Sequence, residues 1–584
     1  MENIFKKLGV LVLFMAITLS CDMDGDLKNP NEASVEQADP QLIMNSIQLD
    51  FADFYSLASG NTVLTDKTTV GVDRLMRMRA MITGYRYQTA FQPQFMDDLW
   101  RTAYQRVLTN IETLLPMAEE KEFTTLIGVA KILKAYTYLT LVDLFGDVPQ
   151  SEALLGLAEF NPSADNGSAI YTQAITLLGE ARTELAKKGL VPGDEIARDI
   201  YYDVDGKHDS ARIRARWTAL ANTLELKAWV NLSMIPARKA EADAKIATFF
   251  DLASGDSKPT VDIIDTEAEN FTYKYGTATV PVSRHPIYRQ YYGPAKGSAT
   301  GYICNSYLAE VYSGLGVEDP RWRYYFYRQV GSLVRAAQVD PKSIGCNPAA
   351  RPARYTAGNY VFCTFEPGFY GRDHGDASGT PADTQVITCA GSYPAAGRAD
   401  ITPTSVSTYF GETQQGQGGN GAGIEPMYMS FFTDFLKAEV MARAGQAAAG
   451  AVLERAVRAS VDQVRSFSNS VGEVLPAGLE PDVDDYVTAV GNKWSGAATN
   501  ADKVKVVGRE LYVACWGSAI EAYNAYRRTS APTHMQPTVQ VGEGLWLRSL
   551  VYPANFVNLN NTAAQKDFGT TNKVFWDNNP DELN

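Results

Sequence analysis

The stretch LVDLFGDVPQSEAL, residues 141–154, brings a strongly apolar segment to an abrupt end. The preceding residues, 126–145, are apolar on more than one side, which is typical of a helix buried between neighbours. Gly146 can adopt a left-handed C-terminal cap, and Pro149 prevents the helix from continuing. Asp147 can accept hydrogen bonds from nearby backbone amides in the turn. We therefore predict a long buried helix that stops at one specific turn.

Further segments show the same helical periodicity and occur in sequential pairs. Apolar residues recur at spacings of three and four, as on the buried face of a helix. The expected pairs are 95–120 with 123–145, 168–188 with 215–234, 429–446 with 449–467, and 482–495 with 503–528. Paired helices of this kind predict tetratricopeptide-like hairpins that bury their apolar faces against one another. The predicted fold is mostly α, a scaffold of helix hairpins with a large loop-rich, partly β insert.

The insert is expected between residues 255 and 428, where Gly, Pro, Ser, Thr and Asn become frequent. The tracts NFTYKYG (270–276) and NYVFCTFEPGFYG (359–371) resemble strands or ordered loops. Residues 271–327 hold 14 aromatic residues in 57 positions, about twice the average of the chain. Aromatic loops on a rigid helical base indicate a binding surface.

The first 21 residues, MENIFKKLGVLVLFMAITLSC, have the features of a targeting segment. Two lysines precede an apolar run that is too short to span a bilayer. The run ends in Leu-Ser-Cys, which resembles the lipobox of bacterial lipoproteins, so we expect a signal peptide over 1–20 and lipidation at Cys21. The acidic DMDGD that follows resembles a surface-export signal of Bacteroidetes lipoproteins. Its spacing excludes an EF-hand calcium loop, because Leu27 stands where that loop needs glycine.

The charge and the cysteines restrict the possible functions. The net charge of −14 argues against nucleic acid as the main partner, because phosphate binding needs a basic surface. Five cysteines follow Cys21 in a setting that permits disulfides, so at least one thiol is free, and Cys515 in a predicted helix is the expected one. The other four, clustered in the insert, allow three pairings that sequence leaves open: Cys304, Cys346, Cys363 and Cys389. Their spacing does not favour zinc.

Catalytic signatures are missing from the sequence. The four histidines are too scattered for a metal-binding helix motif, and no nucleophile elbow or phosphate loop occurs. We expect no cofactor and no metal. GRDHGD (371–376) is interpreted as a solvated turn. An enzyme, such as a surface glycan hydrolase, is a distant alternative, and the acid pair to test for it is Glu366 with Asp373, which lie near Phe365, Phe369 and Tyr370.

Several segments together resemble the SusD/RagB family of nutrient-binding outer-membrane lipoproteins of Bacteroidetes. LFGDVP is similar to the turn that leaves the family's first tetratricopeptide hairpin. The other matching segments are LKNPNEAS at 27–34, WRTAYQRVLTNIETL at 100–114, FLKAEVMARAG at 435–445, EAYNAYRRTSAP at 521–532 and RSLVYPANFVNLNN at 548–561. Ser530 stands where the family usually has glycine, and Phe556 where it often has glutamate.

The resemblance implies a place and a partner. Such proteins are anchored by lipid in the outer membrane, face the cell exterior and form a lid over a SusC-like TonB-dependent transporter. The tetratricopeptide face would contact the barrel, and the variable loops would contact an oligosaccharide or, as the alternative, an oligopeptide. A pure assembly scaffold without ligand is a third possibility.

The resemblance and the pattern together divide the chain into five parts and indicate a ligand site. The parts are the signal peptide (1–20), an anchor and tail (21–45), a helical region (46–254), a loop-rich ligand-binding region (255–428) and C-terminal helical pairs with a closing segment (429–584). Aromatic rings suit stacking on sugars. The candidate ligand-binding residues are Tyr85, Tyr87, Tyr288, Tyr291, Tyr292, Trp322, Tyr324 and Tyr325.

Overall fold

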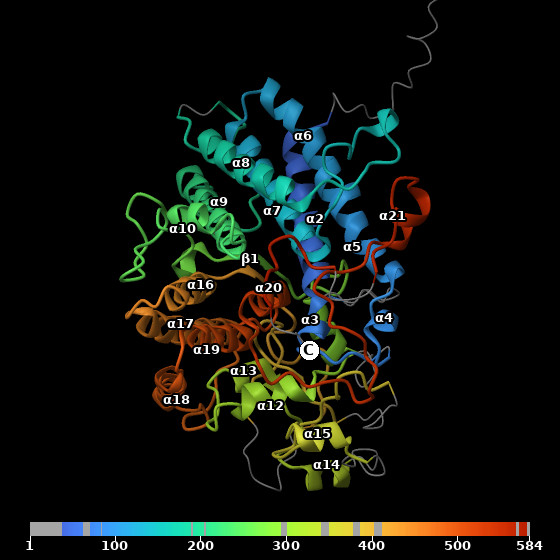
Figure 1. Ribbon diagram of the computed structural model, residues 1–584, viewed down its shortest axis with the longest axis vertical. Coiled ribbons are helices and arrows are strands. Elements are labelled where there is room, and N and C mark those ends of the chain that lie inside the picture. Colours follow the sequence, from blue (N-terminus) through green and yellow to red (C-terminus); the bar gives the residue numbers. More distant parts are fainter. Residues whose placement is uncertain are drawn as a thin grey trace, which may run out of the picture.

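The computed structural model describes residues 38–61, 71–82, 84–188, 191–203, 206–293, 301–339, 350–377, 386–401, 411–567 and 572–580. The expected signal peptide, Cys21 and the acidic DMDGD lie outside these residues. Helices fill the upper and left parts of Figure 1, and segments with little regular structure fill its lower end. The mostly α fold with a loop-rich insert is confirmed.

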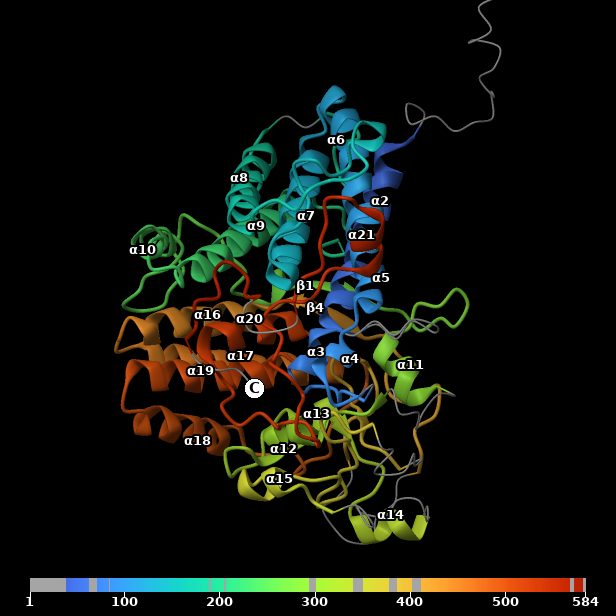
Figure 2. The same ribbon diagram turned by 45° about the vertical axis from the view of Figure 1, so that its right-hand side comes forward.

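The N-terminal helices form the first layers of the scaffold (Figures 1 and 2). They are α2 (Pro40–Ser59), α3 (Val72–Leu75), α4 (Tyr87–Ala90), η2 (Pro93–Met96), α5 (Asp97–Arg101), the π-helical η3 (Thr102–Leu108), α6 (Thr109–Glu120), α7 (Thr124–Phe145), η4 (Gly156–Ala158), α8 (Gly167–Leu185), α9 (Ser210–Leu232) and α10 (Lys239–Ile246). α7 packs against both α6 and α8, and α8 packs against α9. Both helix pairs predicted in this region are therefore confirmed.

α7 is the one helix in the described part of the chain that is long and apolar enough to cross a membrane. Its most apolar window is 89% buried inside the protein, as expected of a core helix. Gly146 follows it with φ 77° and ψ −112°. The positive φ was predicted, but this ψ differs from that of a left-handed cap. The Asp147 carboxylate accepts a hydrogen bond from the amide of Gly167 at 2.8 Å, so it joins the turn to the first residue of α8.

The C-terminal helices α16 (Ser430–Arg443), α17 (Ala449–Ser470), α18 (Val483–Gly496), α19 (Asn500–Ala514) and α20 (Ala519–Thr529) form a second stack. The last helix, α21 (Ala554–Leu559), lies apart from it, against η2 and α5. The single helix expected over 503–528 is wrong, because the chain breaks between α19 and α20. Gly517 in the break has φ 92°, and a Cβ there would lie 2.6 Å from the ring of Pro394.

The insert contains short elements held by long connections. Its helices are η5 (Glu267–Glu269), α11 (Pro286–Tyr292), α12 (Asn305–Ser313), α13 (Trp322–Tyr325), α14 (Leu333–Val339) and α15 (Ala353–Ala357). Strand β1 (Phe271–Lys274) pairs antiparallel with β4 (Ile424–Tyr428), and β2 (Phe326–Tyr327) with β3 (Cys389–Ala390). The strand expected in NFTYKYG is therefore confirmed, whereas NYVFCTFEPGFYG has only an isolated bridge between Phe365 and Phe369.

Side chains from segments that are far apart in the sequence meet in the scaffold core. The Arg528 guanidinium, from α20, forms two hydrogen bonds of 2.9 Å with the Glu439 carboxylate of α16. The guanidinium groups of Arg528 and Arg443 lower the pKa of the buried Glu439 carboxyl. The Asp143 carboxylate near the end of α7 accepts hydrogen bonds from Asn524 at 2.7 Å and from Trp576 at 2.9 Å. Two of the segments that carry the family resemblance, 435–445 and 521–532, are thus joined directly, and the second is also joined to α7 just before the LFGDVP turn.

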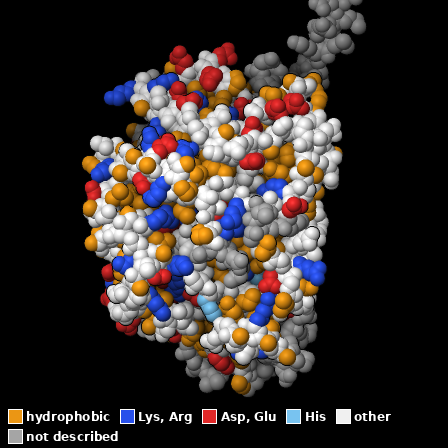
Figure 3. All heavy atoms as spheres, viewed as in Figure 1, with side chains coloured by type: hydrophobic (Ala, Val, Ile, Leu, Met, Phe, Trp, Pro, Cys, Tyr) orange, Lys and Arg blue, Asp and Glu red, His pale blue; other side chains and the backbone are white. Residues whose placement is uncertain are grey.

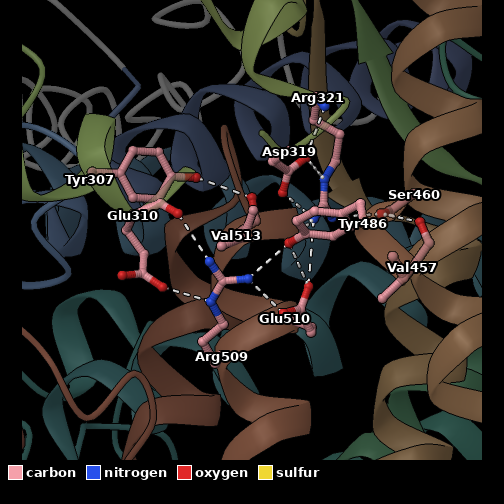
Figure 4. Close-up of polar contacts among 10 residues, drawn as sticks. All are labelled: Tyr307, Glu310, Asp319, Arg321, Val457, Ser460, Tyr486, Arg509, Glu510 and Val513. Atoms are coloured by element: carbon pink, nitrogen blue, oxygen red, sulfur yellow. Dashed lines mark hydrogen bonds and ion pairs between the residues drawn. The ribbon is translucent and has the colours of Figure 1, made fainter. Parts of the chain in front are cut away.

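A buried charged network joins the insert to the C-terminal helices (Figure 4). The Arg321 guanidinium donates to both carboxylate oxygens of Asp319, at 2.9 and 2.7 Å, and to the Ser460 hydroxyl at 2.8 Å. The Tyr486 hydroxyl receives hydrogen bonds from Arg321 and Arg509 and donates to Glu510 at 2.8 Å. Because the charges are paired inside the protein, this network fixes the insert against α17, α18 and α19.

Candidate functional site

The turn after α7 is fixed by side chains from three other segments. The Tyr552 hydroxyl donates to the Asp147 carbonyl oxygen, and the Tyr104 hydroxyl donates to the Pro149 carbonyl oxygen, each at 2.7 Å. The Lys566 ammonium donates at 2.5 Å to the carbonyl oxygen of Phe145, the last residue of α7. Burial lowers the pKa of this ammonium to about 7. The turn is thereby held as a rigid wall beside a groove.

This groove has a volume of about 670 Å³ and lies between α5, the loop after α7, and α21. We call it the aromatic groove, and its apolar lining includes Phe95, Trp100, Tyr104, Phe160, Phe556 and Leu559. Trp100 is 9% exposed and has four aromatic rings around it at centroid distances of 5.0 to 6.1 Å. The indole therefore presents no open face on which a sugar ring could stack.

Two exposed apolar side chains line the aromatic groove, and two more belong to the segment between its lining residues Leu154 and Phe160. They are 52% to 89% exposed and are Leu155, Leu157, Phe160 and Leu559. Hydrophobic side chains gather near α5 and α21 on the surface in Figure 3. A contiguous exposed apolar surface of this kind marks an interaction site. Sequence reasoning missed it, although the apolar residues of LLGLAEF (154–160), directly after a helix stop, were a usable signal.

Several polar side chains of the groove are engaged within the protein. The Arg101 guanidinium pairs with the Asp98 carboxylate at 2.6 Å, and the Asp97 carboxylate accepts a hydrogen bond from the Asn555 backbone amide at 2.9 Å. The second of these contacts holds α21 against α5. The apolar part of the lining suits the apolar side chains of a protein partner.

Seven of the eight aromatic residues predicted to bind ligand are buried. Their exposed fractions are at most 2%, and they are Tyr87, Tyr288, Tyr291, Tyr292, Trp322, Tyr324 and Tyr325. A ring without an exposed face cannot act as a stacking platform in this conformation. Tyr85 is the one that is partly exposed, and its ring lies 5.4 Å from the Arg86 guanidinium. The eight do not form one surface.

The tyrosines of α11 pack and pair with backbone. The rings of Tyr288 and Tyr292 stack with centroids 4.6 Å apart. The Tyr292 hydroxyl donates to the Ala390 carbonyl oxygen at 2.9 Å and accepts from the Arg398 amide at 2.7 Å. Among the described residues no hydrogen-bond partner reaches the buried Tyr291 hydroxyl, and burial raises its pKa. The side chains of Tyr288 and Tyr292 thus have structural partners that the sequence alone did not suggest.

The aromatic residues of α13 and α4 are likewise packed. The Arg323 and Arg328 guanidinium carbons lie 4.4 and 4.6 Å from the Trp322 ring centroid. Tyr325 stacks on Tyr393 at 5.7 Å. The Tyr324 hydroxyl donates to Glu480 at 3.2 Å. In α4, the Tyr87 hydroxyl accepts from Arg77 at 2.8 Å.

The acid pair weighed for catalysis has structural contacts. Both Glu366 carboxylate oxygens accept hydrogen bonds from the Leu333 amide, at 3.1 and 3.2 Å, at the start of α14. Asp373 is buried, and its carboxylate accepts from the Asn305 and Gln536 amides at 3.0 Å. Burial raises the pKa of Asp373 to about 7. GRDHGD is buried throughout, so its interpretation as a solvated turn is wrong.

The cysteines and possible metal ligands complete the inventory. Cys304, Cys389 and Cys515 are free, and Cys363 is disulfide-bonded. The prediction of a free Cys515 is confirmed. Cys304 and Cys389 form no disulfide either, so the four cysteines of the insert do not pair as two disulfides. Cys346 lies outside the described residues. In the described part of the chain no group of three or more His, Cys, Asp or Glu residues is placed to hold a metal ion.

Comparisons with known proteins agree with the fold. The family model SusD-like, described as starch-binding associating with outer membrane, matches residues 30–345. No curated protein matches the chain.

Similar solved structures cover nearly the whole chain. A chitin-binding protein has 19% sequence identity and a TM-score of 0.61, and covers 93% of this chain and 100% of its own. A chitin-binding SusD homologue from Flavobacterium johnsoniae has 16% identity, a TM-score of 0.60 and the same two coverages. A SusD/RagB family protein from Bacteroides thetaiotaomicron has 17% identity and a TM-score of 0.57, over 88% of this chain and 95% of its own. At these identities the likeness concerns the fold.

Proposed function

The chain belongs to the SusD-like family of outer-membrane-associated binding proteins, and on that premise we propose that it is the lid of a SusC-like TonB-dependent transporter. In this role it captures oligosaccharides at the cell surface for import and catalyses no reaction. A nutrient-binding role follows from the family itself. Oligopeptide capture in the same lid role is the second candidate.

The aromatic groove is the observation that carries this proposal. It lies on the helical face, which the family resemblance assigns to the barrel, and its lining includes the exposed apolar side chains of Phe160 and Leu559. Covering these side chains with a partner removes apolar surface from water, at about 25 cal/mol for each Å² buried. A lipid on Cys21 would hold the protein at the outer membrane, facing the cell exterior, so that the partner is always nearby.

The nutrient would bind on the loop-rich side, in the proposed ligand-binding region 255–428 with Tyr85 beside it. Ligand must bind the closed arrangement of lid and barrel more tightly than the open one, because equal affinity would shift nothing. The buried tyrosines of α11 and α13 would then support the loops that contact the nutrient.

The decisive experiment is to purify the outer-membrane complex through a tag on this protein and to identify its components by native mass spectrometry. A TonB-dependent barrel with bound oligosaccharide is the expected result, and a bound peptide would select the second candidate. A barrel that never carries ligand would favour a pure scaffold. Recovery of the protein alone in mild detergent would overturn the lid proposal, and turnover of a polysaccharide by the pure protein would favour an enzyme.

A variant pair tests the groove. Phe160→Ser combined with Leu559→Ser removes two exposed apolar side chains from the groove, and we expect at least a tenfold loss of co-purified barrel. Val474→Ser is the matched control. This side chain is 64% exposed and lies outside the groove lining, so the variant should leave recovery of the barrel unchanged. Equal recovery from all variants would exclude the groove as the contact.

A further inference from the structure

A second hollow, of about 830 Å³, lies between α9, the β1–β4 sheet and the end of α17. We call it the basic cleft. The charged side chains that line it are Arg212, Arg216, Lys274 and Glu267. Three cations to one carboxylate is opposite to the balance of the whole chain, which has 53 basic and 67 acidic residues. The cleft is therefore a local site of positive charge on an acidic protein.

Two of these cations have no acidic partner among the residues that the structure describes. The Arg212 guanidinium lies 3.5 Å from the Asp203 carboxylate, which neutralises it. The half-buried Arg216 donates weakly, at 3.4 Å, to the Tyr202 carbonyl oxygen, and its guanidinium lies 6.0 Å from the Tyr202 ring. Among the residues that the structure describes, no carboxylate lies within ion-pair distance of Arg216 or of the exposed Lys274 at the end of β1.

The acid in the cleft is already hydrogen-bonded. The Glu267 carboxylate accepts from the Gln463 amide at 3.3 Å and from the Ser466 hydroxyl at 3.4 Å. Both partners come from α17, on the opposite wall from Arg216 on α9. The two unpaired cations therefore remain available to an anionic group of a ligand.

The rest of the lining suits a polyhydroxylated ligand. It includes the hydroxyls of Ser466 and Ser470, which donate to the Glu267 carboxylate and to the Phe467 carbonyl oxygen, and the side-chain amide of Asn270, which donates to Gln463. The two hydroxyl oxygens can still accept hydrogen bonds from a ligand. The rings of Tyr275 and Phe467 are partly exposed beside them. Polar groups next to ring surface can hold a sugar, with hydrogen bonds on its edges and apolar contact on its face.

We propose that the basic cleft binds anionic sugar units of an oligosaccharide, with Arg216 and Lys274 contacting the carboxylate of a uronate or the sulfate of a sulfated sugar. This inference rests on the proposed oligosaccharide-binding function and narrows its substrate class. A guanidinium can form two parallel hydrogen bonds with either group, and an ammonium adds a point charge. The cations also counteract the repulsion that a chain of net charge −14 exerts on an acidic ligand.

Isothermal titration calorimetry on the full-length protein tests the proposal. The probes are uronate oligosaccharides prepared from pectin and alginate, the methyl-esterified forms of the same fragments, and sulfated oligosaccharides. Esterification removes the charge and keeps the sugar skeleton. We expect the acidic fragments to bind at least tenfold more tightly than the esters, with an affinity that falls as salt is raised. Whether uronate or sulfate binds more tightly identifies the anionic group.

Variants locate the binding. Arg216→Met combined with Lys274→Met should reduce the affinity for the acidic fragment at least tenfold and leave binding of the ester unchanged. Lys187→Met combined with Lys493→Met removes two charges outside the cleft and is the control. Arg216→Lys, which keeps the charge but loses the two-pronged contact, should recover part of the affinity. Unchanged circular dichroism and thermal midpoint would establish that the variants are folded.

The outcomes separate this inference from the proposed function. Equal binding of acidic and neutral fragments, or acidic binding that the double variant does not weaken, would overturn the basic cleft and leave oligosaccharide capture standing. Failure of every fragment to bind, both to the pure protein and to its complex with the barrel, would overturn both.

Discussion

The helical scaffold and the loop-rich insert satisfy their backbone polar groups in different ways. In the scaffold, helices such as α7 pair almost all of their own amides and carbonyls. In the insert, side chains form many of the hydrogen bonds with backbone groups. Tyr288 and Tyr292, for example, donate to the carbonyl oxygens of Gln417 and Ala390. Buried carbonyl groups need partners wherever regular structure is short. The aromatic enrichment of the insert is therefore explained in large part by packing and backbone pairing, and it is weak evidence for an exposed binding surface.

The largest expected effect comes from the charged network that joins the two regions. Arg321→Met leaves the Asp319 carboxylate buried without its partner, and we expect a loss of roughly 3–5 kcal/mol in the free energy of unfolding. Urea denaturation followed by fluorescence measures it. Arg458→Met, on α17, breaks only two exposed ion pairs, with Glu454 and Asp484, and should cost less than about 1 kcal/mol. Equal costs for the two variants would mean that the network does not hold the insert in place.

The next effect is a pH dependence of the free energy of unfolding, which arises at Glu425 in the β1–β4 sheet. Burial raises the pKa of Glu425 from 4.5 to about 8, and its carboxyl receives hydrogen bonds from Asn61 and Tyr275. Between these two values the folded protein holds a proton that the unfolded chain has released, so stability falls as pH rises through this window and is level above it. Glu425→Gln mimics the protonated form and removes this dependence.

Urea unfolding from below pH 4.5 to above pH 8 measures the difference between Glu425→Gln and the natural protein. The variant should become progressively more stable relative to the natural protein across the window. Glu454→Gln, at an exposed side chain of α17, is the control, for which no such trend is expected. A difference that stays constant with pH would show that Glu425 does not retain its proton in the fold.

A smaller effect tests the turn that ends α7. At Gly146, φ is 77° and ψ is −112°, and no atom lies within 4 Å of an added Cβ. Gly146→Ala therefore introduces backbone strain without a clash, and we expect a loss of roughly 1–3 kcal/mol. Gly491→Ala, inside α18 and equally unobstructed, should instead stabilise by roughly 0.5–1 kcal/mol. Thermal unfolding of both variants decides, and a neutral Gly146→Ala would contradict the strain.

These regions also differ in how far the sequence predicted them. The end of α7 was predictable because Gly146 and Pro149 act on the backbone locally. The break before α20 was not, because Gly517 is needed for contact with Pro394, more than a hundred positions away. The aromatic groove escaped prediction for the same reason. Its walls come from three separate segments, and Phe160 becomes part of a site only once they meet.

The smallest effect is a comparison of two adjacent tyrosines that the sequence predicted as ligand contacts. Tyr292→Phe removes a hydroxyl that pairs with the Ala390 carbonyl and the Arg398 amide, and we expect a loss of roughly 1–2 kcal/mol. Tyr291→Phe removes a buried hydroxyl without a partner and should be neutral or slightly stabilising. Chemical denaturation of the two variants measures the difference. If both variants instead keep full stability and lose affinity for oligosaccharide, these residues contact ligand in a rearranged insert, and the structural explanation of the aromatic enrichment fails.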